Sequence, residues 1–422
     1  MAHEHVSVRQ SAVRVVERMR EAGFQAIFAG GCVRDELLSR EPEDYDVVTD
    51  ATPDQIASLF VGRASLVGAH FGVVIVREWG NAIEVATFRT DGTYSDRRRP
   101  DSVVFSTPEH DARRRDFTVN ALFLDPLTQP NVHGASGRII DFVDGLADLH
   151  DRIIRAVGNP DQRLAEDHLR ALRAARFAAK LGFDIEPSTA DAIRRHAVSL
   201  AGVSRERIGE ELRRMMEHPT RAAAADRMRS LNLEIPALML ESAPFPPTLA
   251  DGSLLAGLSP KATADQALAA YAMDRGAPAT AAAGTQLATL WRTALCLSNE
   301  EQGAIRHIFS HVAELESTFL DQPVAPQKRL CAKWKFDAAL ELATLRRHPS
   351  IQEVIRRVEE LRRQPGNVNP APWLTGDDLI RLGLAPGPNF KRVLDRVYDA
   401  QLDGTTSSVE EAEAFARTLI AG

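Results

Sequence analysis

The sequence has few cysteines, no long apolar run and no excess of positive charge. Its three cysteines, Cys32, Cys296 and Cys331, are widely separated among 422 residues and fit neither a disulfide framework nor a zinc site. No segment approaches the roughly 18 to 20 apolar residues of a membrane-spanning helix. The N-terminus predicts an amphipathic helix without the apolar core of a signal peptide. These absences predict a cytoplasmic protein with no membrane partner.

The formal net charge of −7 disfavours a protein that grips arbitrary nucleic acid. A local basic groove on an acidic body is still compatible with that number, because the local field decides binding. Arginines gather in three short runs, "DRRRP" (96–100), "ARRRDF" (112–117) and "LRALRAARF" (169–177). Such runs are most often solvated surface, but these three lie close to the motifs described below.

The predicted secondary structure changes near residue 150, from alternating helices and strands to mostly helices. Up to about 145, predicted helices and strands alternate. They are a helix (8–22), the strand "QAIFA", a helical "VRDELLS", the strand "DYDVVT" and the helix "PDQIASLF". The runs "GVVIVREW" and "AIEVATFR", separated by Gly80 and Asn81, predict a hairpin. Beyond 150 the pattern is mostly helical, and 422 residues are enough for two to four domains.

Two aspartates lie one residue apart in "DYD". On a strand, Asp44 and Asp46 point to the same face, where they repel each other unless a cation lies between them. Mg²⁺ prefers such oxygen ligands and takes substrate phosphates as others. Glu84, on the hairpin, is the candidate third acid. Metals held by these carboxylates suit in-line attack on a phosphate.

Gly30 and Gly31 end a strand and open a helix shortly before these aspartates. Glycines there let backbone N–H groups approach a phosphate, and Arg34 in the first helical turn is placed to contact a triphosphate. Taken alone, a D-x-D or a Gly-Gly is more often an ordinary turn. Their order and spacing together favour a nucleotide site.

The segment that holds these glycines and aspartates is followed, in order, by four other recognisable motifs. "GGCVRDELLSREPEDYDVVTDATP" resembles the opening motif of class II tRNA nucleotidyltransferases, the family of CCA-adding enzymes and bacterial poly(A) polymerases. "RRRDFTVNAL" (113–122) resembles the ribose-binding motif of that family, and "EDHLRALRAARF" (166–177) its nucleotide-templating motif. "SRERIGEEL" (204–212) resembles its neck-closing helix, and "LTGDDLIRLGLAPGP" (374–388) is similar to a C-terminal element of many bacterial members.

The resemblance implies an α+β fold: a nucleotidyltransferase head with a mixed five-stranded sheet, then an all-helical neck, body and tail. The expected bounds are 1–145 for the head, 146–220 for the neck, 221–345 for the body and 346–422 for a tRNA-binding tail. It also implies that Asp44 and Asp46 hold Mg²⁺, with Glu84 as the third acid. The tRNA 3′-hydroxyl would attack the α-phosphate of CTP or ATP and release pyrophosphate.

In the ribose motif, Asp116 and Asn120 are placed to hydrogen-bond a ribose and Arg115 to reach a phosphate. The ordinary alternative is a helix start with Asp116 near its N-terminus. A 2′-hydroxyl contact is how such a site would prefer ribonucleotides over deoxyribonucleotides.

In the templating motif, Asp167 and Arg170 are expected three apart on one helix and facing one way, with Arg173 and Arg176 continuing that face. A carboxylate accepting from an exocyclic amino group and a guanidinium donating to a ring nitrogen would accept C and A and reject U and G. Arg173 and Arg176 would stack on the base or reach the triphosphate. The alternative is a surface ion pair on an amphipathic helix.

Within the family, the resemblance favours CCA addition to tRNA. The segment "TDGTYSDRRRPDSVVF" (90–105) corresponds to a loop that helps the family's pocket change from C to A. Poly(A), A-only or CC-only addition is the second possibility. A catalytically silent RNA-binding relative and a small-molecule nucleotidyltransferase are further alternatives. A monomer is expected.

Overall fold

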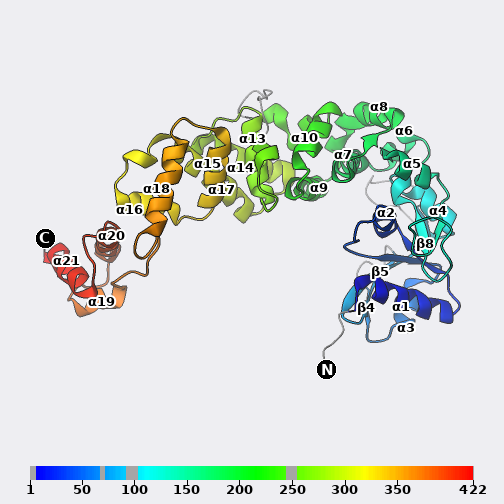
Figure 1. Ribbon diagram of the computed structural model, residues 1–422, viewed down its shortest axis with the longest axis horizontal. Helices are drawn as coiled ribbons and strands as arrows, with labels where there is room; N and C mark the ends of the chain where they lie inside the picture. The colour runs from blue at the N-terminus through cyan, green and yellow to red at the C-terminus, as the bar shows by residue number, and fades with distance from the viewer. Residues whose placement is uncertain (1–5, 67–71, 92–102, 244–253, 422) are drawn as a thin grey trace. The chain divides into compact units, whose positions relative to one another are not determined.

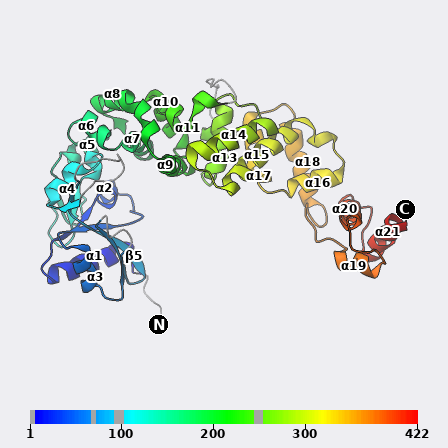
Figure 2. The same ribbon diagram turned by 180° about the vertical axis from the view of Figure 1, so that it is seen from behind.

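The computed structural model describes residues 6–66, 72–91, 103–243 and 254–421. The chain forms two compact units, Met1–Glu211 with Ala223–Ala237, and Leu212–Ala222 with Leu238–Gly422 (Figures 1 and 2). The first holds the large sheet and the second is helical, which confirms the expected α+β class. This coarse division does not test the four predicted domains, whose bounds stay a prediction. Within the described ranges, no helix is long and apolar enough to cross a membrane.

The large sheet of the first unit is mixed, as predicted, because β2 and β5 are parallel and the other pairs antiparallel. Its strands, in spatial order, are β3 (Ala64–Ser65), β4 (Val73–Glu78), β5 (Asn81–Thr87), β2 (Asp46–Thr49), β1 (Ala26–Ala29), β8 (Phe123–Asp125) and β9 (Arg138–Ile140). The expected number of five strands is wrong. The two edge strands are only two and three residues long, so they carry no readable alternation.

The predicted hairpin is present as β4 and β5, with Glu78 paired to Asn81. Its turn is therefore Trp79–Gly80 and not Gly80–Asn81. Trp79 and Gly80 both have positive φ, +49° and +86°, as the two central residues of a tight turn between twisted strands require.

Helix α1 (Val8–Glu21) packs on β1, β2, β4 and β5. A capping box at Ser7 starts it, with Gln10 as the reciprocal partner. An apolar cluster that includes Ile27, Ala29, Val48 and Phe123 also contains Ala112 of α4. Because side chains alternate along a strand, β1 and β2 are buried on both faces.

The remaining elements of the first unit are short helices and two small sheets. The helices are α2 (Gly31–Leu37), α3 (Pro53–Leu59), α4 (Pro108–Arg114), α5 (Gly145–Asp151), α6 (Pro160–Glu166), α7 (Leu169–Leu181), α8 (Pro187–His196), α9 (Arg205–Glu217), α10 (Arg221–Ser230) and α11 (Glu234–Leu238), with 3₁₀ turns at Thr118–Asn120 and Ala197–Gly202. Helices α9, α10 and α11 cross the unit boundary. The small sheets pair β6 (Arg89–Asp91) with β7 (Val103–Phe105), and β10 (Ile153–Ile154) with β11 (Asp184–Ile185).

The second unit contains helices throughout its described part. They are α12 (Leu254–Gly257), α13 (Ala264–Asp274), α14 (Ala281–Leu295), α15 (Asn299–Ser317), α16 (Val324–Cys331), α17 (Phe336–Arg346), α18 (Ile351–Arg363), α19 (Gly376–Arg381), α20 (Asn389–Leu402) and α21 (Val409–Ala421), with 3₁₀ turns at Leu240–Ser242 and Phe319–Asp321. Helices α19 to α21 share an apolar cluster of their own, centred on Leu379, Val393 and Ala416.

Candidate active site

The predicted metal carboxylates lie at the start of β2 and beside it. Asp46 is the first residue of β2 and is paired in parallel register with Glu84 of β5, so both side chains share a face of the sheet. The expectation that Asp44 lies on the strand is wrong, because β2 begins two residues later. Asp44 is exposed and Asp46 half-buried. Burial, then the neighbouring charges of Asp44 and Glu84, raise the pKa of Asp46 to about 6.

This raised pKa marks a concentration of negative charge that a cation would relieve. The donors are carboxylate oxygens, which suit Mg²⁺ bound by one or two carboxylates together with substrate phosphates. In the part of the chain that is described, no three His, Cys, Asp or Glu side chains are arranged to hold a metal ion. Asp44 and Asp46 fit a site of one or two carboxylates with substrate phosphates, and the role of Glu84 as the third acid stays a prediction.

Gly30 and Arg115 occupy adjoining space next to these carboxylates. Gly30 has φ of +79°, and a Cβ on it would lie 2.8 Å from Nη1 of Arg115. Arg115 donates through Nε to Oδ2 of Asp111 (3.0 Å) and through Nη1 to the carbonyl of Asn120 (3.0 Å). Its charge lowers the pKa of Asp46 against the other influences. Gly31 is the first residue of α2, and its added Cβ would meet nothing closer than 3.7 Å.

Asp111 is fully buried and is bonded to two arginines that follow it, Arg114 in the last turn of α4 and Arg115 just after that helix. Its Oδ1 accepts from Nε of Arg114 (2.9 Å), while its Oδ2 accepts from Arg115. Burial by itself raises the pKa of Asp111, but the charges of Arg115 and Arg114 outweigh it and the net shift is downward. An ionised Asp111 therefore fixes the place of Arg115.

Arg34, Asn120, Asp116 and Arg173 form one hydrogen-bonded chain. Arg34 is buried and donates to Oδ1 of Asn120 and to the carboxylate of Asp35. Asn120 Nδ2 donates to Oδ1 of Asp116 (3.1 Å), and Arg173 Nε donates to its Oδ2 (2.8 Å). Burial raises the pKa of Asp116, but Arg173 and these hydrogen bonds reverse the shift.

Asp116 does not start a helix, since α4 ends before it and the 3₁₀ turn begins after it. Arg34 orients Asn120 within the fold, and its contact with a triphosphate stays a prediction.

Three guanidinium groups surround the ring of Phe177 on α7. Arg34, Arg173 and Arg176 lie 5.4, 5.2 and 4.2 Å from its centroid. Arg176 is also paired with Glu211 of α9. Leu169, Leu172 and the alanines of α7 are buried, as predicted.

The structure separates Asp167 from the helix that carries Arg170. Asp167 has extended backbone angles (φ −152°, ψ 102°) and lies between α6 and α7, so the expectation of one continuous helix is wrong. Its carboxylate accepts from Nη1 (3.1 Å) and Nη2 (2.6 Å) of Arg207 on α9. Arg170 is 8% exposed. It donates to Glu166 Oε2 (2.6 Å) and to the carbonyl of Arg114 (3.1 Å).

Sequence reasoning missed Asp111, Glu166, Phe177 and Arg207. Asp111 had a local signal, because Arg114 and Arg115 follow it by three and four residues at the end of α4. Arg207 lies within a motif that was recognised, but it is 40 residues from Asp167. Of the segment 90–105, residues 92–102 lie outside the described ranges.

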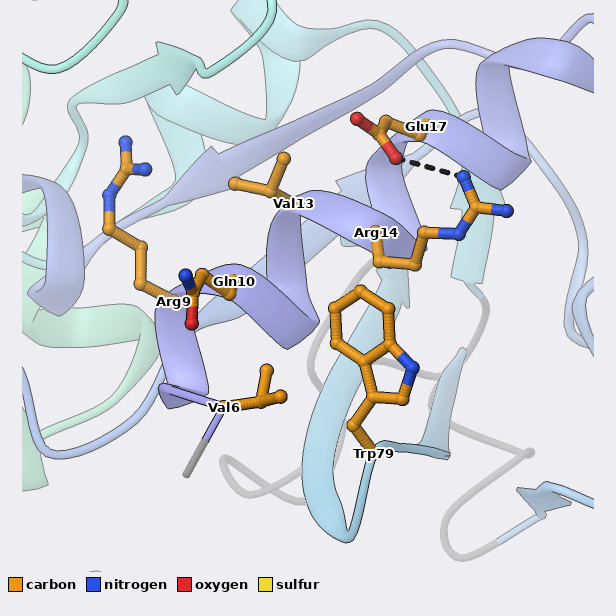
Figure 3. Close-up of a pocket in the computed structure, with 7 residues that line it drawn as sticks. All are labelled: Val6, Arg9, Gln10, Val13, Arg14, Glu17 and Trp79. Carbon is orange, nitrogen blue, oxygen red and sulfur yellow. Dashed lines mark hydrogen bonds and ion pairs between the residues drawn. The ribbon is translucent and has the colours of Figure 1, made fainter. Parts of the chain in front are cut away.

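A hollow of about 630 Å³ lies on the solvent side of α1, next to the β4–β5 turn. Figure 3 shows its lining residues, with Trp79 facing Arg14, and Arg14 paired to Glu17. None of the predicted site residues lines it. We therefore do not assign this hollow as the nucleotide site.

A mixed sheet that presents paired carboxylates beside a glycine-opened helix defines a nucleotidyltransferase head. The sequence profile described as "Poly A polymerase head domain" matches residues 26–155. The profile described as "Probable RNA and SrmB-binding site of polymerase A" matches residues 182–235.

Two curated relatives and one solved structure give the family. A CCA-adding enzyme of Lactiplantibacillus plantarum is 36% identical over 304 residues, which is 71% of each chain. One from Lactobacillus delbrueckii subsp. bulgaricus is 32% identical over 96% of each chain. The crystal structure of the Bacillus stearothermophilus CCA-adding enzyme in complex with CTP superposes with a TM-score of 0.75 at 28% identity, covering 98% of both chains. The chain belongs to the class II tRNA nucleotidyltransferase family and is most like its CCA-adding enzymes.

Proposed function

We propose that this nucleotidyltransferase adds C, C and A to the 3′ end of tRNA, using CTP and ATP. The observation that carries the proposal is the alignment with a CCA-adding enzyme, 32% identical over 96% of both chains. In support, Asp46 and Glu84 are neighbours on adjacent strands, and Asp116 is bonded to Arg173 within the same compact unit. The head, the helical neck and the C-terminal helices all fall within that alignment. A tRNA substrate places the chain in the cytoplasm, and we expect it to act as a monomer.

The tRNA 3′-hydroxyl attacks the α-phosphate and pyrophosphate leaves. Asp44 and Asp46 would hold Mg²⁺, which would supply charge neutralisation at the phosphates and a more acidic hydroxyl. Arg115, braced by Asp111 and the Asn120 carbonyl, adds a fixed positive charge next to Asp46. Asp116 and Asn120 are held by Arg173 and Arg34, so a ribose would meet polar atoms that are already oriented.

Base selection is assigned to Asp167 and Arg170. Cytosine and adenine both offer an exocyclic amino group next to a ring acceptor, whereas uracil and guanine present the opposite pattern. In the ligand-free chain both side chains have protein partners, Arg207 and Glu166. A nucleotide would therefore have to share or replace those partners. Arg173 and Arg176 would complete the pocket next to Phe177.

The test is single-turnover addition to a tRNA that ends at the discriminator base. CTP and ATP are supplied separately and together, and the products are sequenced. Growth by C, C and A that then stops supports the proposal. Growth that stops at CC means that a partner adds the A. Long A tails, or A added only to CC-ended tRNA, move the chain to the poly(A) or A-adding branch.

A catalytically silent RNA-binding relative is the remaining alternative, and the carboxylates separate it from an enzyme. Asp44→Ala is expected to abolish nucleotide addition, because one of two metal ligands is lost, while tRNA binding measured by filter retention stays near the wild-type value. Addition that survives this substitution would refute the metal assignment.

A further inference from the structure

Tyr45 lies between the two predicted metal-binding aspartates in the sequence, and it is more deeply buried than either of them. Asp44 is exposed and Asp46 half-buried, whereas the side chain of Tyr45 is packed in the interior. It is 5% exposed. Its ring meets the ring of Phe28 on β1 edge-on at 5.2 Å, and its hydroxyl donates to Oε1 of Glu36 at 2.8 Å.

Glu36, near the end of α2, is bonded from three sides. Oε1 also accepts from Nε of Arg9 at 2.7 Å, and Oε2 accepts from Oγ of Ser136 at 2.9 Å. Arg9 Nη2 donates in turn to the carbonyl of Ser136. Figure 3 shows the Arg9 side chain running away from Trp79 and Val6. Elements from three parts of the chain thus converge on the carboxylate that receives Tyr45.

Asp44 needs such an anchor more than Asp46 does. The β1–β2 register begins at Asp46, which is paired with Ala29. Asp44 therefore precedes the ladder and is exposed. Without a cation, the like charges of Asp44, Asp46 and Glu84 push the segment apart. A buried neighbour tied to α2 opposes that displacement.

We propose that Tyr45 is a positioning residue, whose hydrogen bond to Glu36 holds Asp44 and Asp46 in the geometry that binds the divalent ion. The inference rests on the metal assignment in the proposed function. The side chain of Tyr45 is engaged with Phe28 and Glu36. It acts through the backbone that it shares with the two aspartates.

The test measures binding of Mn²⁺ alone, by electron paramagnetic resonance of the free ion, together with thermal unfolding of the full chain. Tyr45→Phe removes only the hydroxyl and keeps the ring against Phe28. The matched control is Thr87→Val on β5, which removes a buried hydroxyl that donates to the Ala51 carbonyl at 2.7 Å. Asp46→Asn removes a predicted metal ligand and so tests whether Mn²⁺ binds at this site. Glu36→Gln weakens the Tyr45–Glu36 hydrogen bond from the acceptor side.

We expect Tyr45→Phe and Glu36→Gln to raise the Mn²⁺ dissociation constant about tenfold, since a hydrogen bond to a charged acceptor is weakened or lost. Thr87→Val should lower the unfolding temperature and leave Mn²⁺ binding unchanged. If Asp46→Asn loses Mn²⁺ while Tyr45→Phe binds it as the wild type does, Tyr45 has only a structural role. The inference about Tyr45 then fails, and the metal assignment stands. If Asp46→Asn binds Mn²⁺ normally, the metal assignment fails and the inference fails with it.

Discussion

Gly30 is constrained twice, by its own backbone angles and by a neighbouring guanidinium. Its angles (φ +79°, ψ −127°) are accessible to glycine but not to a residue with a Cβ. Arg115 fills the space that a side chain would take. From the sequence, this glycine was expected to admit a phosphate. The structure adds that it admits the arginine that lies next to Asp46.

Gly30→Ala is therefore expected to lower both stability and activity. Backbone strain should cost about 1–3 kcal/mol of unfolding free energy, and displacement of Arg115 should lower kcat by about tenfold or more. The control is Gly158→Ala, where φ is +71° but no atom lies within 4 Å of the added Cβ. Chemical denaturation and single-turnover rates separate the two effects. A Gly30→Ala variant with the kcat of the control would contradict the role of Arg115.

The pKa of Asp46 makes stability depend on pH in a definite direction. Its folded-state value of about 6 exceeds the ordinary 3.8, so the folded chain binds more protons than the unfolded chain between these values. Asp46 therefore contributes less stability as pH rises from about 4 to about 6, and ionised Asp46 is unfavourable above that range without metal.

From this sign, Asp46→Asn is expected to exceed the metal-free wild type in unfolding temperature at pH 7.5 and to match it near pH 4. Mg²⁺ should stabilise the wild type at pH 7.5 and leave the variant unchanged. Thermal unfolding at both pH values, with and without Mg²⁺, checks this. A variant less stable than the wild type at pH 7.5 would show that Asp46 is not under like-charge strain.

At the scale of elements, α9 supplies the partner of the predicted base-selecting carboxylate. Arg207 holds Asp167 through both terminal nitrogens, while Arg176 of α7 is paired with Glu211 further along α9. Helix α9 therefore holds two residues of the predicted templating motif, Asp167 and Arg176.

Arg207→Ala is expected to relax nucleotide choice more than it slows addition. With its partner gone, Asp167 can rotate, and the acceptor that distinguishes cytosine from uracil is no longer fixed. The ratio of kcat/KM for CTP to that for UTP should fall about tenfold. Arg195→Ala, which breaks a more exposed pair with Asp161, is the control and should leave the ratio unchanged. A ratio that stays at the wild-type value in Arg207→Ala would remove Asp167 orientation from the selection mechanism.

At the scale of the whole molecule, the chemistry and the C-terminal helices belong to different compact units. Helix α20 is joined to α16 largely through polar contacts. Arg329 donates to Asp399 Oδ1 at 2.6 Å and lies 5.1 Å from the ring of Tyr398, and the Ala325 amide donates to Asp403. The cluster shared by α19 to α21 is separate from these contacts.

If the tail grips tRNA, Arg329→Ala should raise the KM for tRNA several-fold and leave the KM for CTP and kcat nearly unchanged. The reason is that a loosened α16–α20 contact alters where the tail lies without touching the head. Arg363→Ala, which breaks an exposed ion pair with Glu359, is the matched control, because exposed pairs contribute only about 0–1 kcal/mol. Steady-state kinetics with tRNA and CTP varied separately give the answer. An unchanged KM for tRNA would argue against a tRNA-binding tail.

Much of the head was predictable because its signals are local. The alternation from helix to strand to glycine to helix, and the caps at Ser7 and Thr52, depend on residues within one or two turns. The strands β3, β8 and β9 of the large sheet were missed because two or three residues carry no periodicity. The break between Asp167 and α7 was missed because Glu166, Asp167 and His168 are compatible with a continuous helix, and only packing interrupts it.

The sequence by itself determined the α+β class, the spacing of Asp44 and Asp46 one residue apart, and the family, because each depends on residue order and short spacings. Only the tertiary structure decided which arginine faces which carboxylate. Arg173 pairs with Asp116, Arg207 with Asp167, and Arg170 with Glu166. Three arginines lie within four residues of Asp116 and two within four residues of Asp167, yet both acids pair with arginines much further along the chain, so spacing cannot make the choice. The choice is made where α7, α9 and the ribose motif are packed, since a buried charge must find a partner there.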